Sequence, residues 1–196
     1  MKKIAVFVSG SGSDMQSVID AINAGEIDAK IELVVASKSG IFAIERAKVA
    51  GLNAEVFCKA DFESIDEMYD KLIERLKMLD VEYIVLAGYL TILTPNIIKA
   101  FEHHIINIHP ALIPKYCGMG MYGMKVHQAV IANREKISGA TVHFVDEGAD
   151  TGEIIAQETV PVFENDTAEI LQKRVLELEH KLLPKTLKNL FAKEIK

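Results

Sequence analysis

Two polar residues of types that do chemistry end an apolar run near the middle of the chain. The run begins at His104, it ends in Asn107 and His109, and Pro110 follows directly. Its β-branched residues indicate a buried strand, and Pro110 stops strand pairing because it has no N–H to donate. Side chains two residues apart lie on the same side of a strand, so an amide and an imidazole could hold a tetrahedral oxyanion together. The residues alone equally allow a turn-capping Asn107 and a satisfied loop histidine at position 109.

A third candidate, Asp150, lies in an acidic, glycine-rich segment at residues 146–152. An Asn, a His and an Asp together suit attack of an amine on a carbonyl group. Asn107 and His109 would stabilise the oxyanion, and Asp150 would keep His109 cationic and help to accept the amine proton. This chemistry needs no metal. Nothing in the sequence marks the nearby Cys117 as an activated nucleophile.

A run of Ser and Gly at residues 9–13 follows the first predicted strand. Small residues permit a tight turn, and a helix N-terminus offers free N–H groups to an anion, so we expect a phosphate-binding loop. The spacing of Ser13 and Gln16 also predicts a capping box. The motif is neither a dinucleotide-binding G-x-G-x-x-G, because residue 15 is Met, nor a P-loop, because no Gly-Lys-Ser/Thr follows. An ordinary strand-to-helix turn is the alternative.

Strands and helices alternate in the first half of the chain, and they must position these residues. Apolar runs predict strands at 4–8, 31–36, 54–57, 83–87, 104–109, 138–145 and 154–162. Helical spacing predicts helices at 14–24, 41–50, 61–79, 96–101 and 126–132, and a last helix capped by Asp166 or Thr167. We expect Pro184 to kink or break that last helix. The alternation implies a parallel sheet to which the second half adds antiparallel strands.

The composition is that of a globular protein. The 196 residues suffice for one domain with a sizeable core, and a hydrophobic content of 49% argues against disorder. The formal net charge of −6 argues against a broad nucleic-acid-binding surface, and no apolar run is long enough to span a membrane. Two cysteines without metal-type spacing fit a reducing, cytoplasmic location. The sequence does not fix the oligomeric state and leaves a homodimer open.

The chain resembles the folate-dependent formyltransferases over nearly its whole length. Four segments carry the resemblance, namely residues 9–13, 86–93, 107–114 and 139–152. The Asn-x-His-Pro piece with a spaced Asp is typical of this superfamily, and the Gly/Ser loop and short length favour the members that use glycinamide ribonucleotide. The fold class implied is α/β: one Rossmann-like domain with a mostly parallel twisted sheet, helices on both faces and an antiparallel C-terminal extension.

The resemblance also implies an activity. Such an enzyme moves a formyl group from 10-formyltetrahydrofolate to the amine of 5′-phosphoribosylglycinamide in de novo purine biosynthesis. Asn107, His109 and Asp150 match the catalytic trio of the family. Residues 1–196 would form one domain, with a phosphate-binding half at 1–100 and a catalytic, folate-binding half at 101–196. Its partners would be these two small molecules, with no metal, nucleic acid or membrane.

The resemblance carries over two further sets of residues. Those matching substrate-binding positions are Gly10, Ser11, Gly12, Ser13, Asp14 and Glu179. Those matching folate-binding positions are Tyr89, Leu90, Thr91, Ile92, Leu93, Asn107, His143, Val145, Asp146, Glu147, Gly148 and Ala149. Two structural alternatives remain: Glu179 as a solvent-facing helix charge, and the residues after Gly88 as core packing.

Three other functions compete with this one. A methionyl-tRNA formyltransferase would need an additional nucleic-acid-binding domain and a basic surface. A formyltetrahydrofolate hydrolase usually carries an N-terminal regulatory domain, whereas Met1 here leads straight into the first predicted strand. A non-enzymatic module that binds nucleotides or folates would tolerate the loss of Asp150 and show no turnover.

Overall fold

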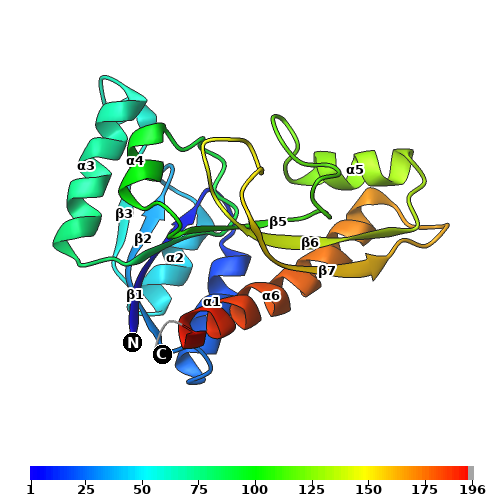
Figure 1. Cartoon of the computed structure of the whole chain (residues 1–196), viewed down its shortest axis with the longest axis horizontal. Coiled ribbons are helices and arrows are strands. Elements are labelled where there is room, and N and C mark those ends of the chain that lie inside the picture. The colour runs from blue at the N-terminus through cyan, green and yellow to red at the C-terminus, as the bar shows by residue number, and fades with distance from the viewer. Residues whose placement is uncertain (194–196) are drawn as a thin grey trace.

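The computed structural model describes residues 1–193, and within them seven strands form one sheet (Figure 1). The strand order is β3-β2-β1-β4-β5-β6-β7. The strands are β1 (Lys2–Val8), β2 (Ala29–Ala36), β3 (Ala54–Val56), β4 (Tyr83–Leu86), β5 (Ile105–His109), β6 (Ile137–Phe144) and β7 (Ile154–Pro161). Strands β1 to β5 pair in parallel, whereas β6 and β7 join as an antiparallel edge. The predicted fold class is confirmed.

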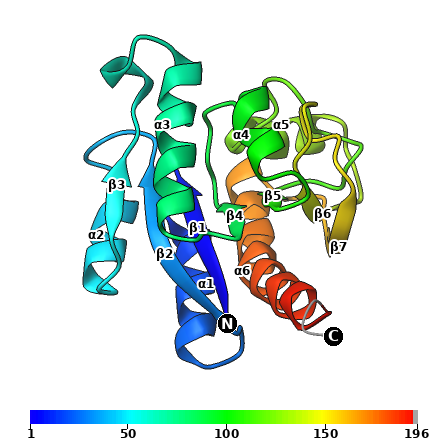
Figure 2. The same cartoon turned by 60° about the vertical axis from the view of Figure 1, so that its left-hand side comes forward.

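Helices cover both faces of this sheet (Figure 2). They are α1 (Ser13–Asn23), α2 (Phe42–Val49), α3 (Ile65–Met78), α4 (Pro95–Ala100), α5 (Met124–Ala132) and α6 (Ala168–Lys193). The helix predicted from residue 61 begins later, because Ser64 caps α3 by accepting from the N–H of Glu67 at 3.0 Å. Across residues 1–193, no helix combines the length and the apolar character that a membrane crossing requires.

The central strand β1 contributes to two separate hydrophobic cores. Ile4, Val6 and Val8 face the core that α1, α2 and α6 cover. Ala5 and Phe7 face the core that α3 and α4 cover. All five side chains are fully buried. Burial on both faces explains why this strand is continuously apolar in the sequence.

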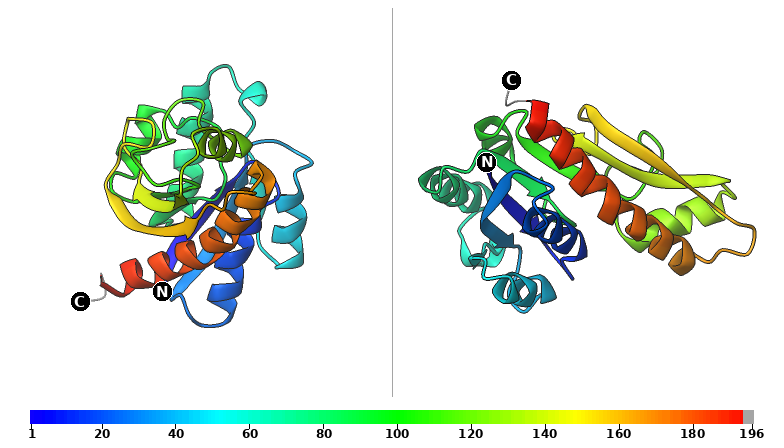
Figure 3. Two further views of the ribbon diagram at one scale, coloured as in Figure 1. Left: turned by 90° about the vertical axis from the view of Figure 1, so that its right-hand side faces the viewer. Right: turned by 90° about the horizontal axis from the view of Figure 1, so that it is seen from below.

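The last helix, α6, runs beneath β6 and β7 and packs against α1 (Figure 3). Thr167 caps it, since its Oγ1 accepts from the N–H of Ile170 at 3.3 Å. The break expected at Pro184 is wrong, because the helix continues through this residue. Leu182, Leu183 and Leu187 on either side are buried in the core, and this packing offsets the hydrogen bond that proline cannot make.

Candidate functional site

The candidate site lies where β1, β4 and β5 end, at the carboxyl edge of the parallel sheet. Ser9 joins the loops after β1 and β4: its N–H donates to the carbonyl of Gly88 at 3.2 Å, and its Oγ accepts from the N–H of Leu90 at 2.9 Å. The predicted phosphate-binding loop and the predicted folate-binding segment are therefore neighbours. Ser9 belongs to the run predicted to form the phosphate-binding loop, but the sequence gave no sign that this residue joins the two loops.

Three side chains meet at the end of β5, as the sequence predicted for Asn107, His109 and Asp150. Nδ1 of His109 lies 3.7 Å from Oδ2 of Asp150. The other carboxylate oxygen of Asp150 lies 3.7 Å from Nε2 of His143. These separations are longer than a hydrogen bond, so the carboxylate faces both imidazoles without binding either directly. His109 and His143 are 4% and 1% exposed, so the water-poor surroundings strengthen these electrostatic interactions.

One hydrogen bond to the backbone and one with the Asn107 side chain fix the imidazole of His143. Its Nδ1 donates to the carbonyl of Phe144 at 2.7 Å, and burial lowers its pKa and so favours the neutral ring. A neutral imidazole has one donor, so Nε2 is an acceptor. It accepts from Nδ2 of Asn107 at 3.1 Å. His143 therefore sets which way the Asn107 amide points.

Two aspartates share the loop after β6, and their surroundings differ. Oδ1 of Asp146 accepts from the N–H of Gly148 at 3.0 Å and from Oγ1 of Thr151 at 2.6 Å, so this residue stabilises the turn. Asp150 instead faces the two histidines, and its backbone is left-handed with φ of 59°. Asp150 thus lies beside His109 and His143, and His143 in turn contacts Asn107.

The loop before α1 is shaped by Gly12, whose φ is 71°. A Cβ here would lie 2.7 Å from Cβ of Ala43, so both conformation and space demand glycine. Gly12 is the N-cap of α1, and its carbonyl accepts from the N–H of Gln16 at 2.9 Å. The predicted capping box is wrong, because Ser13 is already helical and the Gln16 side chain donates to Asp20.

Arg46 of α2 reaches this loop from outside. Its Nε donates to the carbonyl of Ser11 at 2.9 Å, and the N–H of Ala43 donates to the carbonyl of Gly10 at 3.2 Å. Both bonds engage carbonyl groups and so leave backbone N–H groups of the loop for an anion. The sequence gave no signal for Arg46, because its partner is a backbone carbonyl 35 residues away.

Asp14 and Glu179, both predicted to bind substrate, come together from α1 and α6. They are 9% and 7% exposed, which excludes the solvent-facing alternative for Glu179. Burial, with a smaller contribution from the Asp14 charge, raises the pKa of Glu179 well above its usual range. Burial also raises the pKa of Asp14, although His180, whose Nε2 lies 3.7 Å from Asp14 Oδ1, opposes the shift. A carboxyl pair thus lies beside the predicted phosphate-binding loop.

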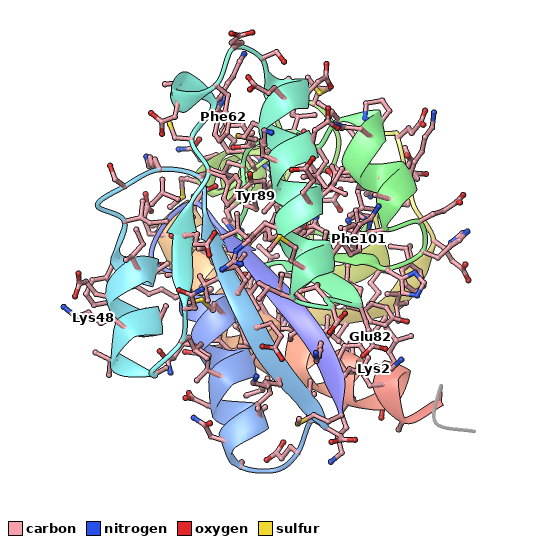
Figure 4. The ribbon with its side chains drawn as sticks, turned by 90° about the vertical axis from the view of Figure 1, so that its left-hand side faces the viewer. Lys2, Lys48, Phe62, Glu82, Tyr89 and Phe101 are labelled. Atoms are coloured by element: carbon pink, nitrogen blue, oxygen red, sulfur yellow. The ribbon has the colours of Figure 1, made fainter. Side chains whose placement is uncertain are left out.

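The predicted folate-binding segment after β4 has both core and exposed residues. Tyr89 packs edge-on against Phe7 at 5.2 Å between ring centroids, and Figure 4 shows it between Phe62 above and Glu82 and Lys2 below. Leu90 and Ile92 are 59% and 63% exposed. The core-packing alternative therefore holds for Tyr89 but not for these two, which offer an apolar surface to a flat ring.

The remaining predicted folate residues border the same segment. Leu93 and Val145 both pack on the core beneath α3 and α4. Glu147 lies 3.9 Å from Nζ of Lys99. Along the loop that starts at Val145, the residues from 146 to 149 are exposed. Tyr69 was missed by the sequence reasoning: its hydroxyl donates to the carbonyl of Ile92 at 3.2 Å and so supports the segment.

Cys117 also lies near Asp150. Its Sγ donates to the carbonyl of Pro114 at 3.3 Å. Burial, and then the negative charge of Asp150, raise the pKa of the Cys117 thiol. A raised pKa disfavours the thiolate that nucleophilic catalysis needs, so Cys117 is no activated nucleophile.

Known proteins are similar to this chain over nearly its whole length. The formyl transferase family matches residues 2–187. The phosphoribosylglycinamide formyltransferase of Haemophilus influenzae is 42% identical over 188 residues, which cover 96% of this chain and 86% of that protein. The chloroplastic enzyme of that name from Vigna unguiculata is 45% identical over 181 residues, and the match covers 92% of this chain but 58% of that protein.

The fold is also similar to that of a solved structure. Glycinamide ribonucleotide transformylase 1 from Symbiobacterium toebii superposes with a TM-score of 0.93 at 35% identity, covering 99% of this chain and 89% of that one. The family match spans nearly the whole chain and includes every residue of the site described above. This chain belongs to the formyl transferase family.

Proposed function

We propose that this protein transfers a formyl group from 10-formyltetrahydrofolate to the amine of 5′-phosphoribosylglycinamide, giving formyl-glycinamide ribonucleotide and tetrahydrofolate in cytoplasmic de novo purine biosynthesis. One observation carries the proposal: at the carboxyl edge of the sheet Asp150 lies 3.7 Å from both His109 and His143, and His143 contacts Asn107. Ser9 connects the loop that can hold a phosphate to the segment that exposes Leu90 and Ile92. Catalytic, phosphate-binding and ring-binding groups are thus adjacent.

The three catalytic residues have distinct roles in this proposal. Asn107 donates one amide N–H to His143. Its second N–H can therefore donate to the formyl oxygen as negative charge develops there. Protonated His109 donates to the same oxygen through Nδ1, because its Nε2 is bonded to the carbonyl of Tyr116. Asp150 stabilises positive charge on His109 and accepts the proton that the attacking amine loses. Loss of tetrahydrofolate as the leaving group then completes the transfer.

The two small molecules would bind on either side of these residues. The backbone N–H groups at residues 10–14 would hold the phosphate, and Glu179 would contact the glycinamide ribonucleotide. Within residues 89–93 and 145–149, the exposed positions Leu90, Ile92 and 146–149 would enclose the folate ring. Asp14 faces α6 with its carboxyl group, so its backbone rather than its side chain suits the phosphate.

A paired assay tests this function. The purified protein receives 10-formyltetrahydrofolate with and without phosphoribosylglycinamide, and deformylation is followed by absorbance. Turnover only with the ribonucleotide supports the transferase. Equal turnover in both mixtures would instead show a hydrolase, and no turnover would favour another amine acceptor or a binding module.

Two substitutions test the roles of the residues. His109→Ala and Asp150→Asn should each lower kcat by at least about 10²-fold, the typical worth of an oxyanion donor or an acid–base group. Glu153→Gln is the matched control, because this exposed carboxylate lies in the same loop-to-strand region. Near-wild-type kcat in both site variants would contradict the mechanism.

A further inference from the structure

The imidazole of His109 depends on a loop for its orientation. Its Nε2 lies 2.8 Å from the backbone carbonyl of Tyr116, so Nε2 carries the proton and donates. That bond leaves Nδ1 to face Asp150. A carbonyl seven residues away, outside β5, therefore selects which nitrogen of His109 is presented to the reaction.

The same loop also holds Asp150. The N–H of Gly118 donates to Oδ2 of Asp150 at 2.8 Å, and this oxygen is the one nearest Nδ1 of His109. Residues 116–118 thus bind both members of the pair, one through a carbonyl and the other through an N–H. The left-handed backbone at Tyr116, with φ of 54°, is part of this arrangement.

The Tyr116 side chain is anchored at a distance from the site. Its hydroxyl donates to Oε1 of Glu135 at 2.9 Å, and Nζ of Lys115 donates to the same oxygen at 2.9 Å. Glu135 lies in the turn between α5 and β6. The two bonds from Lys115 and Tyr116 lower the pKa of Glu135, so the acceptor is a carboxylate at neutral pH.

We infer that Tyr116 and Glu135 are positioning residues for the reaction: their hydrogen bond fixes the loop whose carbonyl sets the tautomer and orientation of His109. A non-glycine residue in the left-handed region is intrinsically unfavourable, so Tyr116 needs an external anchor to stay there. Glu135 supplies that anchor from an element that takes no part in the site. The kinetic consequence of this inference rests on the proposed function, whereas its structural consequence does not.

Tyr116→Phe is the central test, because it removes the hydroxyl and keeps the ring and the backbone. It should lower kcat roughly tenfold with little change in either KM. This decrease in kcat lies between the effect of losing one hydrogen bond and the effect of misplacing a catalytic group. Glu135→Ala should act in the same direction. Glu135→Gln keeps an oxygen acceptor and should recover most of the activity.

Lys115→Met is the matched control. It removes the other donor to Glu135, yet the Tyr116–Glu135 bond and the His109–Tyr116 bond do not depend on it. This variant should keep the kcat of the wild type. A loss as large as that of Tyr116→Phe would overturn the inference, because it would point to general loosening of the loop.

Nitrogen NMR of the imidazoles tests the same inference without any activity. The His109 signals, assigned with a His109→Asn variant and compared at a pH at which the ring is neutral, should show a proton on Nε2 in the wild type and a mixed tautomer in Tyr116→Phe. Unchanged His109 signals in that variant, with unchanged kcat, would overturn the inference. If the wild type lacks transferase activity but the tautomer still shifts, the proposed function fails and the positioning role stands.

Discussion

Nδ2 of Asn107 lies 3.1 Å from Nε2 of His143, directly across the antiparallel pair of β5 and β6. The register of this pair decides the contact, since Asn107 and His143 are opposite partners. The backbone bond from His143 Nδ1 to Phe144 leaves Nε2 as an acceptor, and that acceptor orients the amide. The antiparallel strand β6 therefore does more than extend the sheet, because it orients the amide that we propose as a catalytic donor.

The first prediction concerns this orientation. His143→Leu should lower kcat by about 10-fold or more, because Asn107 loses the partner that aims its N–H and an oxyanion donor must be placed accurately. A double-mutant cycle checks the cause. Asn107→Ala should cost much less in the His143→Leu background than in the wild type. Fully additive losses would show that His143 acts independently of Asn107.

The second prediction concerns the loop before α1. Gly12→Ala should lower the stability by about 1–2 kcal/mol from the left-handed φ alone, and the contact with Ala43 should add to this. It should also raise the KM for the ribonucleotide, because the loop must shift. Gly10→Ala is the control, since a Cβ there meets nothing within 4 Å. Urea unfolding and steady-state kinetics of both variants give the comparison, and equal effects at positions 10 and 12 would contradict it.

Sequence reasoning found the parts of the site that depend on local pattern. A buried strand that ends in Asn107 and His109 is visible because apolar spacing and Pro110 mark both its course and its end. The resemblance to the family points to Asp150, and in the structure Asp150 faces His109 whereas Asp146 is occupied with its own turn. The course and the end of the strand are set by short-range geometry, which the order of residues determines directly.

Other parts depend on contacts between distant segments, and a pattern does not show these. The bond from His109 to Tyr116 uses a backbone carbonyl, which every residue has and which the sequence therefore cannot mark. The burial of Glu179 arises from the packing of α6 on α1, although a charged residue beside an apolar stripe usually faces solvent. Pro184 likewise remains helical because tertiary packing outweighs its local preference.

The third prediction follows from the buried carboxyl pair. Because the folded state raises the pKa of Glu179, its contribution to stability is present below its unfolded pKa and is lost as pH rises through the folded value. The Gln side chain of Glu179→Gln does not ionise, so this variant avoids the loss of stability at high pH. Without ligand it should be more stable than the wild type at pH 8 by about 1–3 kcal/mol, which is the cost of a buried polar group without a partner. The same change should raise the KM for the ribonucleotide roughly tenfold, as expected for a lost hydrogen bond to a charged group.

Glu177→Gln is the control for that prediction, because Glu177 is an exposed carboxylate on the same helix. It should alter neither the unfolding free energy nor the KM measurably. Thermal melts at about pH 5 and about pH 8 would separate the two variants. A Glu179→Gln protein that is less stable than the wild type at both values would show that Glu179 has a stabilising partner in the folded state.

The last prediction concerns His127 on α5. It is 2% exposed, and its buried Nδ1 has no hydrogen-bond partner among the described residues. Burial, and then the charge of His109, lower the pKa of His127 to about 4. The unfolded chain, with an ordinary histidine pKa near 6.5, then binds more protons between about pH 4 and 6.5. Stability must therefore fall as pH decreases through this window.

A matched pair of proteins isolates this effect. Between about pH 7 and pH 5, the wild type should lose about 1–2 kcal/mol more unfolding free energy than His127→Gln, which cannot titrate at this position. Urea unfolding at the two values measures the difference, and contributions from Asp14, Glu179 and other carboxyl groups cancel in the comparison. Parallel losses in both proteins would mean that His127 keeps an ordinary pKa in the folded state, and thus that its ring is hydrated or paired rather than buried neutral beside His109.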